Sequence, residues 1–182
     1  LPKTEDKIGN PLSPYAVTKQ TDELYAKVFA LNYEMKIIGL RYFNVFGPKQ
    51  NPRSQYSAAI PRFIKEILNN KSPIIYGDGE QTRDFVFVDD VVIANILATQ
   101  SRFSGVAVNI ARQEKVSLNQ LIKLIGEILE INIRPIYKKA KPGDIKHSWA
   151  DIQEAKRIIA YKPIYPLKNS LKKTIEWYKK FI

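Results

Sequence analysis

The chain has 182 residues, of which 45% are hydrophobic, so it can bury the core of about one domain. It contains no cysteine and a single histidine, which excludes disulfides, zinc–thiolate sites, cysteine nucleophiles and histidine-rich metal cages, and we predict no metal site. The net charge is +11, but the lysines are dispersed and form no block of about five or six, which argues against nucleic acid as a partner. There is no apolar stretch of about 18 residues and no signal-peptide pattern, so we expect no membrane segment and a cytoplasmic location.

The first predicted element is a helix over residues 14–32. Ser13 offers a hydroxyl N-cap, and Pro14 suits the first helical position because its missing N–H would have no partner there. Side chains that recur in steps of three and four behind this start predict one buried stripe. The members of the stripe are Val17, Thr21, Leu24, Val28 and Leu31.

The remaining chain alternates between strand and helix patterns. Residues 36–43 are rich in β-branched and aromatic side chains and predict a strand, and a polar loop with two prolines follows at 47–56. Further strands are predicted at residues 72–76, 84–88, 106–110 and 131–137, and further helices at 60–68, 89–99, 118–129, 151–159 and 167–181. Ser117 is the expected N-cap of the helix at 118–129. This alternation predicts an α/β fold.

Tyr15 and Lys19 stand four residues apart in the first turns of the first helix, so they share one face of it. A phenol with a pKa near 10 is a poor base at neutral pH, and a neighbouring ammonium favours the tyrosinate. The pair is therefore a candidate acid–base site, although the same spacing also occurs by chance. Tyr25 and Tyr33 have no lysine four residues on, and we expect them to pack.

Several motifs stand in a fixed order along the chain. Residues 13–19 read SPYAVTK and residues 40–48 read LRYFNVFGP. Further motifs are AIPRF at 59–63, YGDGEQTRDF at 76–85, VDDV at 88–91, and Gly-Asp at 143–144 ahead of Ala-Asp at 150–151. In this order they resemble the extended short-chain dehydrogenase/reductase family, the NAD-dependent nucleotide-sugar epimerases and dehydratases, over essentially the whole chain.

The resemblance implies a cofactor and residues that contact it. The cofactor is NAD. Tyr15 would move the proton of a sugar hydroxyl as base and acid, while Lys19 would hold the nicotinamide ribose and lower the pKa of Tyr15. Tyr42 would contact the cofactor from its strand.

The resemblance also implies a set of substrate-binding residues. They are Asn44, Ala59, Ile60, Tyr76, Arg83, Lys141, Asp144 and Ser148. Asn44 and Arg83 would hold the diphosphate of a UDP-sugar, and Tyr76 would lie against the uracil ring; a guanidinium suits this because its planar fork matches phosphate oxygens. The alternatives are a surface cation for Arg83 and a packing aromatic for Tyr76.

The chain departs from the family pattern at two places. Lys141 stands where the family has an arginine, so a point charge would replace a bidentate contact, with Lys139 as a possible substitute. None of the eight glycines forms the Gly-x-x-Gly-x-x-Gly of the cofactor loop, and the family's catalytic serine is expected before Leu1.

We therefore expect the carboxy-terminal part of a Rossmann-type fold: the active-site helix, the last strands of the sheet and a small α/β substrate-binding domain. Residues 1–46 would be the remaining part of the NAD-binding domain, and residues 47–182 mainly the substrate domain, with segments that return to the sheet. Such a piece is expected to be inactive by itself.

Among the reactions of this family, the chain most resembles UDP-N-acetylglucosamine 4-epimerases and close UDP-glucose 4-epimerases. Ser148 stands where enzymes restricted to UDP-glucose carry a bulky tyrosine, which leaves room for an N-acetyl group. The expected reaction is 4-epimerisation through a transient 4-keto sugar. The neighbouring His147 is expected to make a structural hydrogen bond rather than to act as an acid.

Two classes of alternative stay open. One is another reaction of the family, namely a dehydratase, a decarboxylase or a glucuronate epimerase. The other is a noncatalytic module that binds a nucleotide-sugar. A homodimer is also expected from the resemblance, with the first helix in the interface, although Val28, Phe29 and Tyr33 are equally compatible with an internal core.

Overall fold

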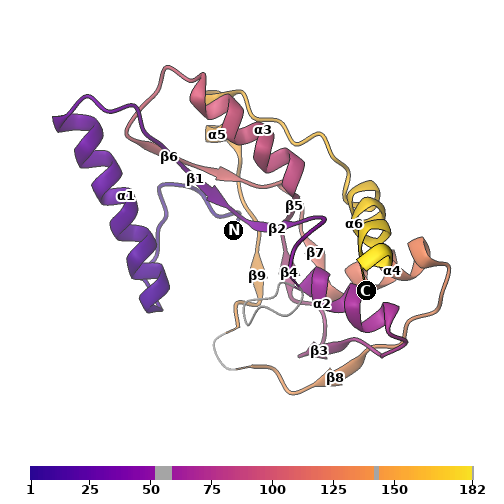
Figure 1. Cartoon of the computed structure of the whole chain (residues 1–182). Helices are drawn as coiled ribbons and strands as arrows, with labels where there is room; N and C mark the ends of the chain where they lie inside the picture. The colour runs from indigo at the N-terminus through magenta and orange to yellow at the C-terminus, as the bar shows by residue number, and fades with distance from the viewer. Residues whose placement is uncertain (52–58, 142–143, 182) are drawn as a thin grey trace.

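The computed structural model of the chain describes residues 1–51, 59–141 and 144–181. The elements in chain order are α1 (Pro14–Asn32), β1 (Ile38–Tyr42), β2 (Asn44–Phe46), α2 (Ala59–Leu68), β3 (Ile74–Tyr76), β4 (Thr82–Arg83), β5 (Phe85–Phe87), α3 (Val88–Thr99), β6 (Val106–Ile110), β7 (Val116–Ser117), α4 (Leu118–Leu129), β8 (Ile136–Lys138), β9 (His147–Ser148), α5 (Gln153–Ile159) and α6 (Leu167–Phe181). The α/β fold class is confirmed (Figure 1).

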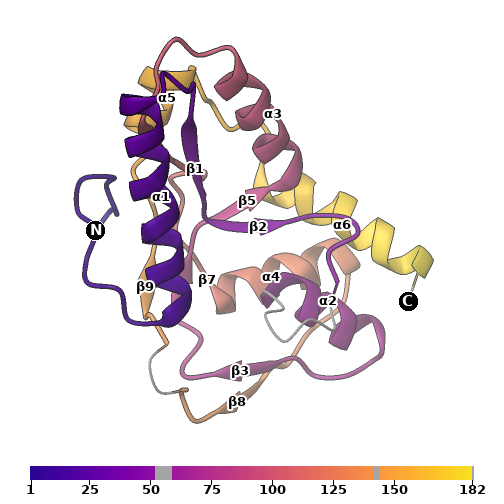
Figure 2. The same cartoon turned by 60° about the vertical axis from the view of Figure 1, so that its left-hand side comes forward.

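Two hydrophobic cores lie on opposite sides of the β2–β5 pair. These two strands run parallel, and alternate residues of β5 enter different cores: Phe85 and Phe87 enter one and Val86 the other. The first core is built with α2, α4 and α6, and we call this part the α4–α6 half. The second joins β1 and β6 to α3 and α5, and we call this part, together with α1, the β1–β6 half. Figure 2 shows the β1–β6 half above the α4–α6 half.

Most strand pairings are parallel and connect segments far apart in the chain. β1 pairs with β6 from Ile38 opposite Val106 to Tyr42 opposite Ile110. β3 pairs with β8 in the same parallel sense. β4 lies between β7, which is antiparallel to it, and β9, which is parallel. The carboxyl end of β1 and the short strands β4 and β9 carry three of the residues singled out from the sequence, Tyr42, Arg83 and Ser148.

The local signals for helix starts are confirmed. Ser13 accepts a hydrogen bond from the Ala16 backbone N–H at 3.2 Å, and α1 spans the predicted residues 14–32. Ser117 and Gln120 form a reciprocal capping box at the start of α4. These caps satisfy backbone donors that would otherwise have no partner in the helix.

Some strand predictions are wrong in extent. The strand predicted at 131–137 is restricted to β8 at Ile136–Lys138. The two-residue strands β4, β7 and β9 were not predicted, because two residues carry no periodicity. Of the predicted loop at 47–56, residues 52–56 lie outside the described residues.

The predicted buried stripe of α1 is wrong. No residue of α1 is buried, and Val17, Leu24, Val28 and Leu31 are exposed together with Thr21. The half-buried residues of α1 that face the rest of the molecule are instead Ala16, Gln20, Glu23, Ala26 and Ala30. The reason is the opposing surface, which offers small and polar residues and therefore accepts the small face of the helix.

Candidate active site

Tyr15 and Lys19 lie together on an exposed face of α1. The Lys19 Nζ is 5.9 Å from the centroid of the Tyr15 ring, and Tyr15 is 73% exposed. The ammonium of Lys19 donates a hydrogen bond to Asp22 Oδ2 at 2.9 Å, and this bond raises the pKa of Lys19. The structure therefore brings the two predicted residues together, with the lysine directed to an acidic neighbour that the sequence analysis did not single out.

Tyr42 and Asn44 lie where β1 ends and β2 begins. The Tyr42 hydroxyl donates to Asn95 Oδ1 at 3.0 Å, and the Tyr42 side chain is about half exposed. The Asn44 side-chain amide donates to the backbone carbonyl of Asp84 at 3.1 Å. Asn44 was predicted to donate to a diphosphate, and its amide nitrogen has an internal partner in this structure.

Arg83 and Ser148 lie opposite each other in the β4–β9 pair. The Arg83 guanidinium donates to Asp144 Oδ1 at 2.6 Å and to the carbonyls of Thr82 and Lys146 at 2.9 and 3.3 Å. Arg83 and Asp144, both predicted to bind substrate, thus form an ion pair with each other.

The histidine beside Ser148 has a partner on the neighbouring strand. His147 Nδ1 lies 3.0 Å from the Thr82 hydroxyl across the β4–β9 pair. The hydrogen bond expected for His147 is present.

Tyr76 and Lys141 come together through the β3–β8 pair. The Lys141 Nζ is 4.4 Å from the centroid of the Tyr76 ring, within cation–π range. The Arg62 guanidinium carbon is 5.9 Å from the same centroid. Gln81, which is buried, donates to the Tyr76 carbonyl at 2.6 Å and fixes the backbone after β3.

Ile60 does not present its side chain to a ligand. It is fully buried in the core of the α4–α6 half, because it falls on the inward face of α2, and only its backbone is available for a contact. Ala59 is half-buried in the first turn of the same helix. Ile60 therefore stays a predicted substrate-binding residue whose side chain belongs to the core.

Two buried carboxylates near these residues were missed from the sequence. Asp84, next to Arg83, is fully buried and accepts hydrogen bonds from the backbone N–H groups of Arg112 and Ala150 at 2.9 and 3.2 Å. Burial raises the pKa of Asp84 to about 6. Asp90 is also fully buried and accepts from the Ile164 N–H at 2.8 Å. An aspartate directly before the apolar run 85–88 was the available signal.

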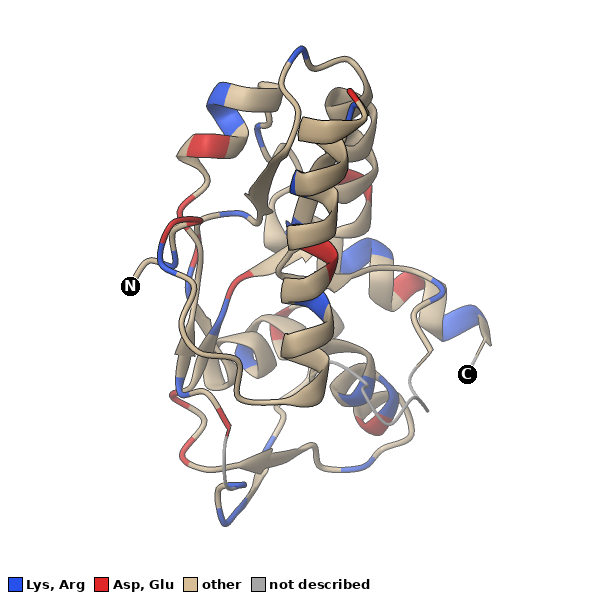
Figure 3. Ribbon diagram, turned by 90° about the vertical axis from the view of Figure 1, so that its left-hand side faces the viewer, with Lys and Arg blue, Asp and Glu red and all other residues tan. Residues whose placement is uncertain are grey.

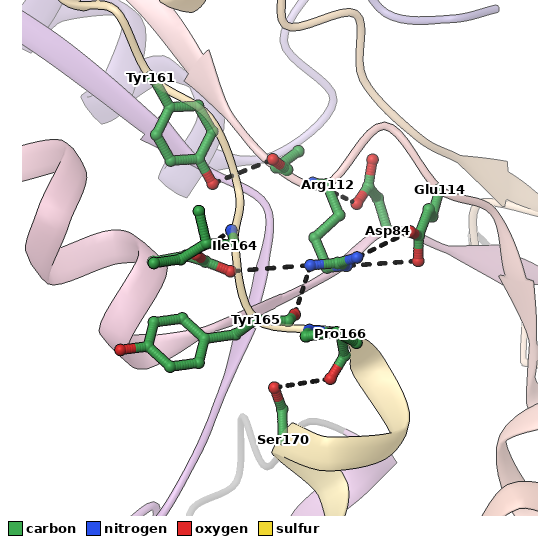
Figure 4. Close-up of polar contacts among 10 residues, drawn as sticks. Asp84, Arg112, Glu114, Tyr161, Ile164, Tyr165, Pro166 and Ser170 are labelled. Carbon is green, nitrogen blue, oxygen red and sulfur yellow. Dashed lines mark hydrogen bonds and ion pairs between the residues drawn. The ribbon is translucent and has the colours of Figure 1, made fainter.

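Arg112 joins these buried groups to the chain after α5 (Figure 4). Its guanidinium lies 3.8 Å from Asp90 Oδ2, forms a bidentate pair with Glu114 and donates to the Tyr165 carbonyl. These contacts of Arg112, whose backbone N–H binds Asp84, connect the two halves of the molecule.

The candidate residues form two groups. Tyr15, Lys19 and Tyr42 belong to α1 and β1, and most of the others lie on or next to β3, β4, β8 and β9. Asn44 on β2 and the pair Ala59 and Ile60 on α2 belong to neither group. The amino-terminal end of α1 points toward the side of the molecule that contains β3, β8 and β9 (Figure 2). The charged residues of α1, coloured along its ribbon in Figure 3, are Lys19, Asp22, Glu23 and Lys27, and all of them except Glu23 are exposed.

Within the part of the chain that the structure describes, no cluster of three metal-ligating His, Asp or Glu side chains is found. None of the described helices is long and apolar enough to cross a membrane.

Parallel strands joined by helices, with a Tyr–x–x–x–Lys helix beside them, define a Rossmann-type dehydrogenase/reductase architecture. Residues 2–111 match the NAD dependent epimerase/dehydratase family, and the chain belongs to this family.

Several similar proteins are sugar-nucleotide epimerases by name. A solved structure described as a UDP-N-acetylglucosamine 4-epimerase from Methanobrevibacter ruminantium, in complex with UDP-N-acetylmuramic acid, is 42% identical with a TM-score of 0.95, over 100% of this chain and 58% of that one. A putative UDP-glucose 4-epimerase of Methanocaldococcus jannaschii is 37% identical over 98% of this chain and 57% of that protein. A UDP-glucuronate 4-epimerase of Thermodesulfobacterium geofontis is 34% identical over 97% of this chain and 53% of that protein. The chain thus spans little more than half the length of these relatives.

Proposed function

We propose that this chain belongs to an isomerase that interconverts a UDP-sugar and its 4-epimer with NAD as cofactor. The observation that carries the proposal is the placement of Tyr15 and Lys19 side by side on an exposed face at the start of α1. An acid–base tyrosine has to reach a ligand from outside the helix, and a nearby ammonium favours its ionised form.

The residues in the β1–β6 half fit the ribose and nicotinamide end of a dinucleotide. The hydroxyl of Tyr15 and the ammonium of Lys19 are donors on one face, and Tyr42 stands at the carboxyl end of β1, the edge where open α/β sheets bind ligands. When bound, NAD supplies an acceptor and donor for the hydrogen at C4 of the sugar. The chain's own contribution is to take up the hydroxyl proton at Tyr15 Oη and later return it, with a 4-keto sugar between the two transfers.

The residues around β3, β4, β8 and β9 suit the nucleotide end of the substrate. Arg83 and Lys141 supply positive charge for a diphosphate, and Tyr76 supplies an aromatic face for a base. In this structure Arg83 is paired with Asp144, and Lys141 lies over the Tyr76 ring. A substrate phosphate would therefore replace Asp144 as the partner of Arg83. Asn44 would likewise give up its hydrogen bond to the Asp84 carbonyl and donate to the diphosphate instead.

We further propose UDP-N-acetylglucosamine and UDP-N-acetylgalactosamine as substrates, with UDP-glucose and UDP-galactose also accepted. Ser148 is small, half-buried and opposite Arg83, so an acetamido group near the anchored diphosphate would find space beside it. The organisation proposed is that residues 1–46 contribute to the cofactor-binding domain and residues 47–182 mainly to the substrate-binding domain. The exposed apolar side chains on α1 and at its C-cap, Val28, Phe29 and Tyr33 among them, are proposed to be covered in a homodimer.

The test is chromatographic product analysis with the complete protein in which this chain occurs, incubated with NAD and UDP-N-acetylglucosamine. We expect UDP-N-acetylgalactosamine to form and Tyr15→Phe to abolish it. The matched control is Tyr25→Phe, on the same helix, where the ring packs 6.5 Å from Phe29 and turnover should be retained.

Other products would favour the alternatives. A 4-keto deoxy sugar, a decarboxylated sugar or turnover of UDP-glucuronate alone would assign a sibling reaction, and turnover of UDP-glucose alone would contradict the inference from Ser148. Stabilisation by UDP without any product would indicate a noncatalytic binding module.

A further inference from the structure

The helix that carries Tyr15 and Lys19 rests on the sheet without an apolar core of its own. None of its residues is buried, and its half-buried face is mainly alanine with Gln20 and Glu23. A hollow of about 410 Å³ lies between α1, β1, β6 and α5. Since few apolar contacts are made, hydrophobic burial does little to fix how α1 is rotated or how far it slides along the sheet.

The sheet surface opposite α1 explains this contact. Side chains alternate along β1, so Ile38, Leu40 and Tyr42 line the side of α3, whereas Gly39 and Arg41 line the side of α1. At Gly105, which precedes β6, an added Cβ would lie 3.3 Å from the Ala30 Cβ. The helix thus approaches closely through small residues, and Arg41 is the long side chain of β1 on that side.

Arg41 makes the specific contact between β1 and α1. Its Nε and one terminal nitrogen donate to the two carboxylate oxygens of Glu23, both at 2.7 Å, and its other terminal nitrogen donates to the Glu5 carbonyl at 3.2 Å. The two side chains are 24% and 30% exposed, so the pair is partly shielded from solvent. The Glu5 carboxylate in turn accepts from the Asn109 backbone N–H on β6 at 2.7 Å. A bidentate arginine–carboxylate pair fixes orientation as well as distance.

Tyr15, Lys19 and Glu23 follow one another at four-residue intervals on α1. They therefore belong to one side of the helix, and Glu23 lies about 12 Å along the axis from Tyr15. Arg41 directly precedes Tyr42 on β1. We propose that Glu23 and Arg41 are positioning residues, whose pairing sets the rotation and height of α1 on β1 and thereby holds Tyr15 and Lys19 in place relative to Tyr42. This inference rests on the proposed function for its kinetic consequences.

The kinetic test is Glu23→Gln in the complete protein, with NAD and UDP-N-acetylglucosamine. A small displacement of Tyr15 lowers the rate of the proton transfer, so kcat is expected to fall about tenfold or more. KM is expected to stay within about twofold, because the proposed nucleotide contacts lie on other elements. The kcat–pH profile is expected to change, since rotation of α1 would move the Lys19 ammonium, 5.9 Å from the centroid of the Tyr15 ring here, together with Tyr15 relative to the substrate.

Matched variants separate positioning from general stability. Glu127→Gln makes the same change in another ion pair between elements, the 3.1 Å contact with Lys168 on α6, and should leave kcat and the pH profile unchanged. Glu23→Asp keeps the carboxylate and should recover part of kcat. A fall in kcat with an unmoved pH profile, or with KM rising in parallel, would assign the pair a merely structural role and overturn the proposal.

A second measurement does not depend on activity. Amide hydrogen exchange of α1 should accelerate in Glu23→Gln while α4 is unaffected, because α1 loses the contact that fixes it. Unchanged exchange in α1 would overturn the proposal whatever the kinetics. Absence of any epimer with the unmodified protein would instead refute the proposed function, so the two failures are distinguishable.

Discussion

Helices α1 and α4 each have an apolar stripe of similar spacing, but the stripe of α4 is buried and that of α1 is exposed. In α4 the stripe is buried and includes Leu118, Leu121, Ile122 and Ile125. In α1 the stripe is exposed, and the helix turns alanines toward the sheet. Periodicity shows that a helix has an apolar face, but the surface opposite the helix decides whether that face is covered.

The two opposing surfaces differ in side-chain size. α4 packs between α2 and α6, where Phe63, Ile64 and Leu171 complete a dense apolar core. α1 meets Gly39, Arg41 and Ala107 on the sheet. The first contact is held by apolar burial and the second by one directed ion pair, so the two helices should respond differently to the same mutation.

The largest expected difference comes from removing one leucine from each helix. Leu121→Ala leaves a cavity at a fully buried site and should lower the free energy of unfolding by about 2–5 kcal/mol. Leu24→Ala removes a side chain that is 60% exposed in the single chain and, for the chain as a monomer, should change it by less than about 0.5 kcal/mol. Urea unfolding followed by circular dichroism measures both. Equal losses would show that the outer face of α1 is covered in solution.

The buried carboxylate between the two halves should make stability depend on pH. The pKa of Asp84 is about 6 in the folded chain, against an ordinary value of 3.8. Between these values the folded state keeps a proton that the unfolded state has lost. Stability from this group is therefore complete below about pH 4, declines as the pH rises to 6, and the total decline is about 3 kcal/mol.

The measurement is thermal unfolding of the chain and of Asp84→Asn from pH 4 to pH 7. The variant loses an acceptor for a buried N–H and should be less stable throughout, but it cannot ionise. The stability gap between the two proteins should therefore narrow as the pH rises. Parallel curves would show that Asp84 titrates at its ordinary pKa.

A smaller effect is expected at the turn that joins the core of α4 to Tyr76. Gly79 has φ of +79°, and an added Cβ would lie 2.1 Å from Asn119 Oδ1 in the first turn of α4. Asn119 is held by Tyr137 and donates to Glu80 at 2.6 Å, so it has little freedom to move.

Gly79→Ala should lower the free energy of unfolding by about 1–3 kcal/mol, because it combines a left-handed backbone with a steric clash. Thermal shift measurements would show this, and would also show weaker stabilisation by UDP if the turn positions Tyr76. Gly9→Ala is the control, since its Cβ would meet nothing within 4 Å. A loss as large at Gly9 would contradict the assignment to the turn.

Much of the fold was predictable because its signals are local. Ser13, Pro14 and Ser117 mark helix starts by hydrogen-bonding needs that the next few residues decide. The fate of the stripe on α1 was not predictable in this way, because it depends on Gly39 and Arg41, which belong to the strand that follows.

The residue types of the candidate site were predictable, but their partners were not. Arg83 and Asp144 pair across 61 positions of sequence, and this pairing depends on the register of β4 with β9. Strands of two residues leave no pattern from which a register could be inferred. The same holds for Asn44, whose partner is a backbone carbonyl 40 positions away.

The smallest expected effect concerns the ion pair of Lys19 and Asp22 on α1, which is exposed to solvent whereas Asp84 is buried. Asp22→Asn removes the hydrogen bond that raises the pKa of Lys19, so that pKa should return toward its ordinary value of 10.5. The stability due to this pair is present below that value and is lost only as the pH rises through the raised pKa, so little change is expected at neutral pH. NMR titration of the Lys19 side chain measures the shift, with Glu130→Gln at the C-cap of α4 as a control of equal charge. An unmoved titration of Lys19 in Asp22→Asn would show that its ammonium is free of Asp22 in solution, and thus already available for a ligand beside Tyr15.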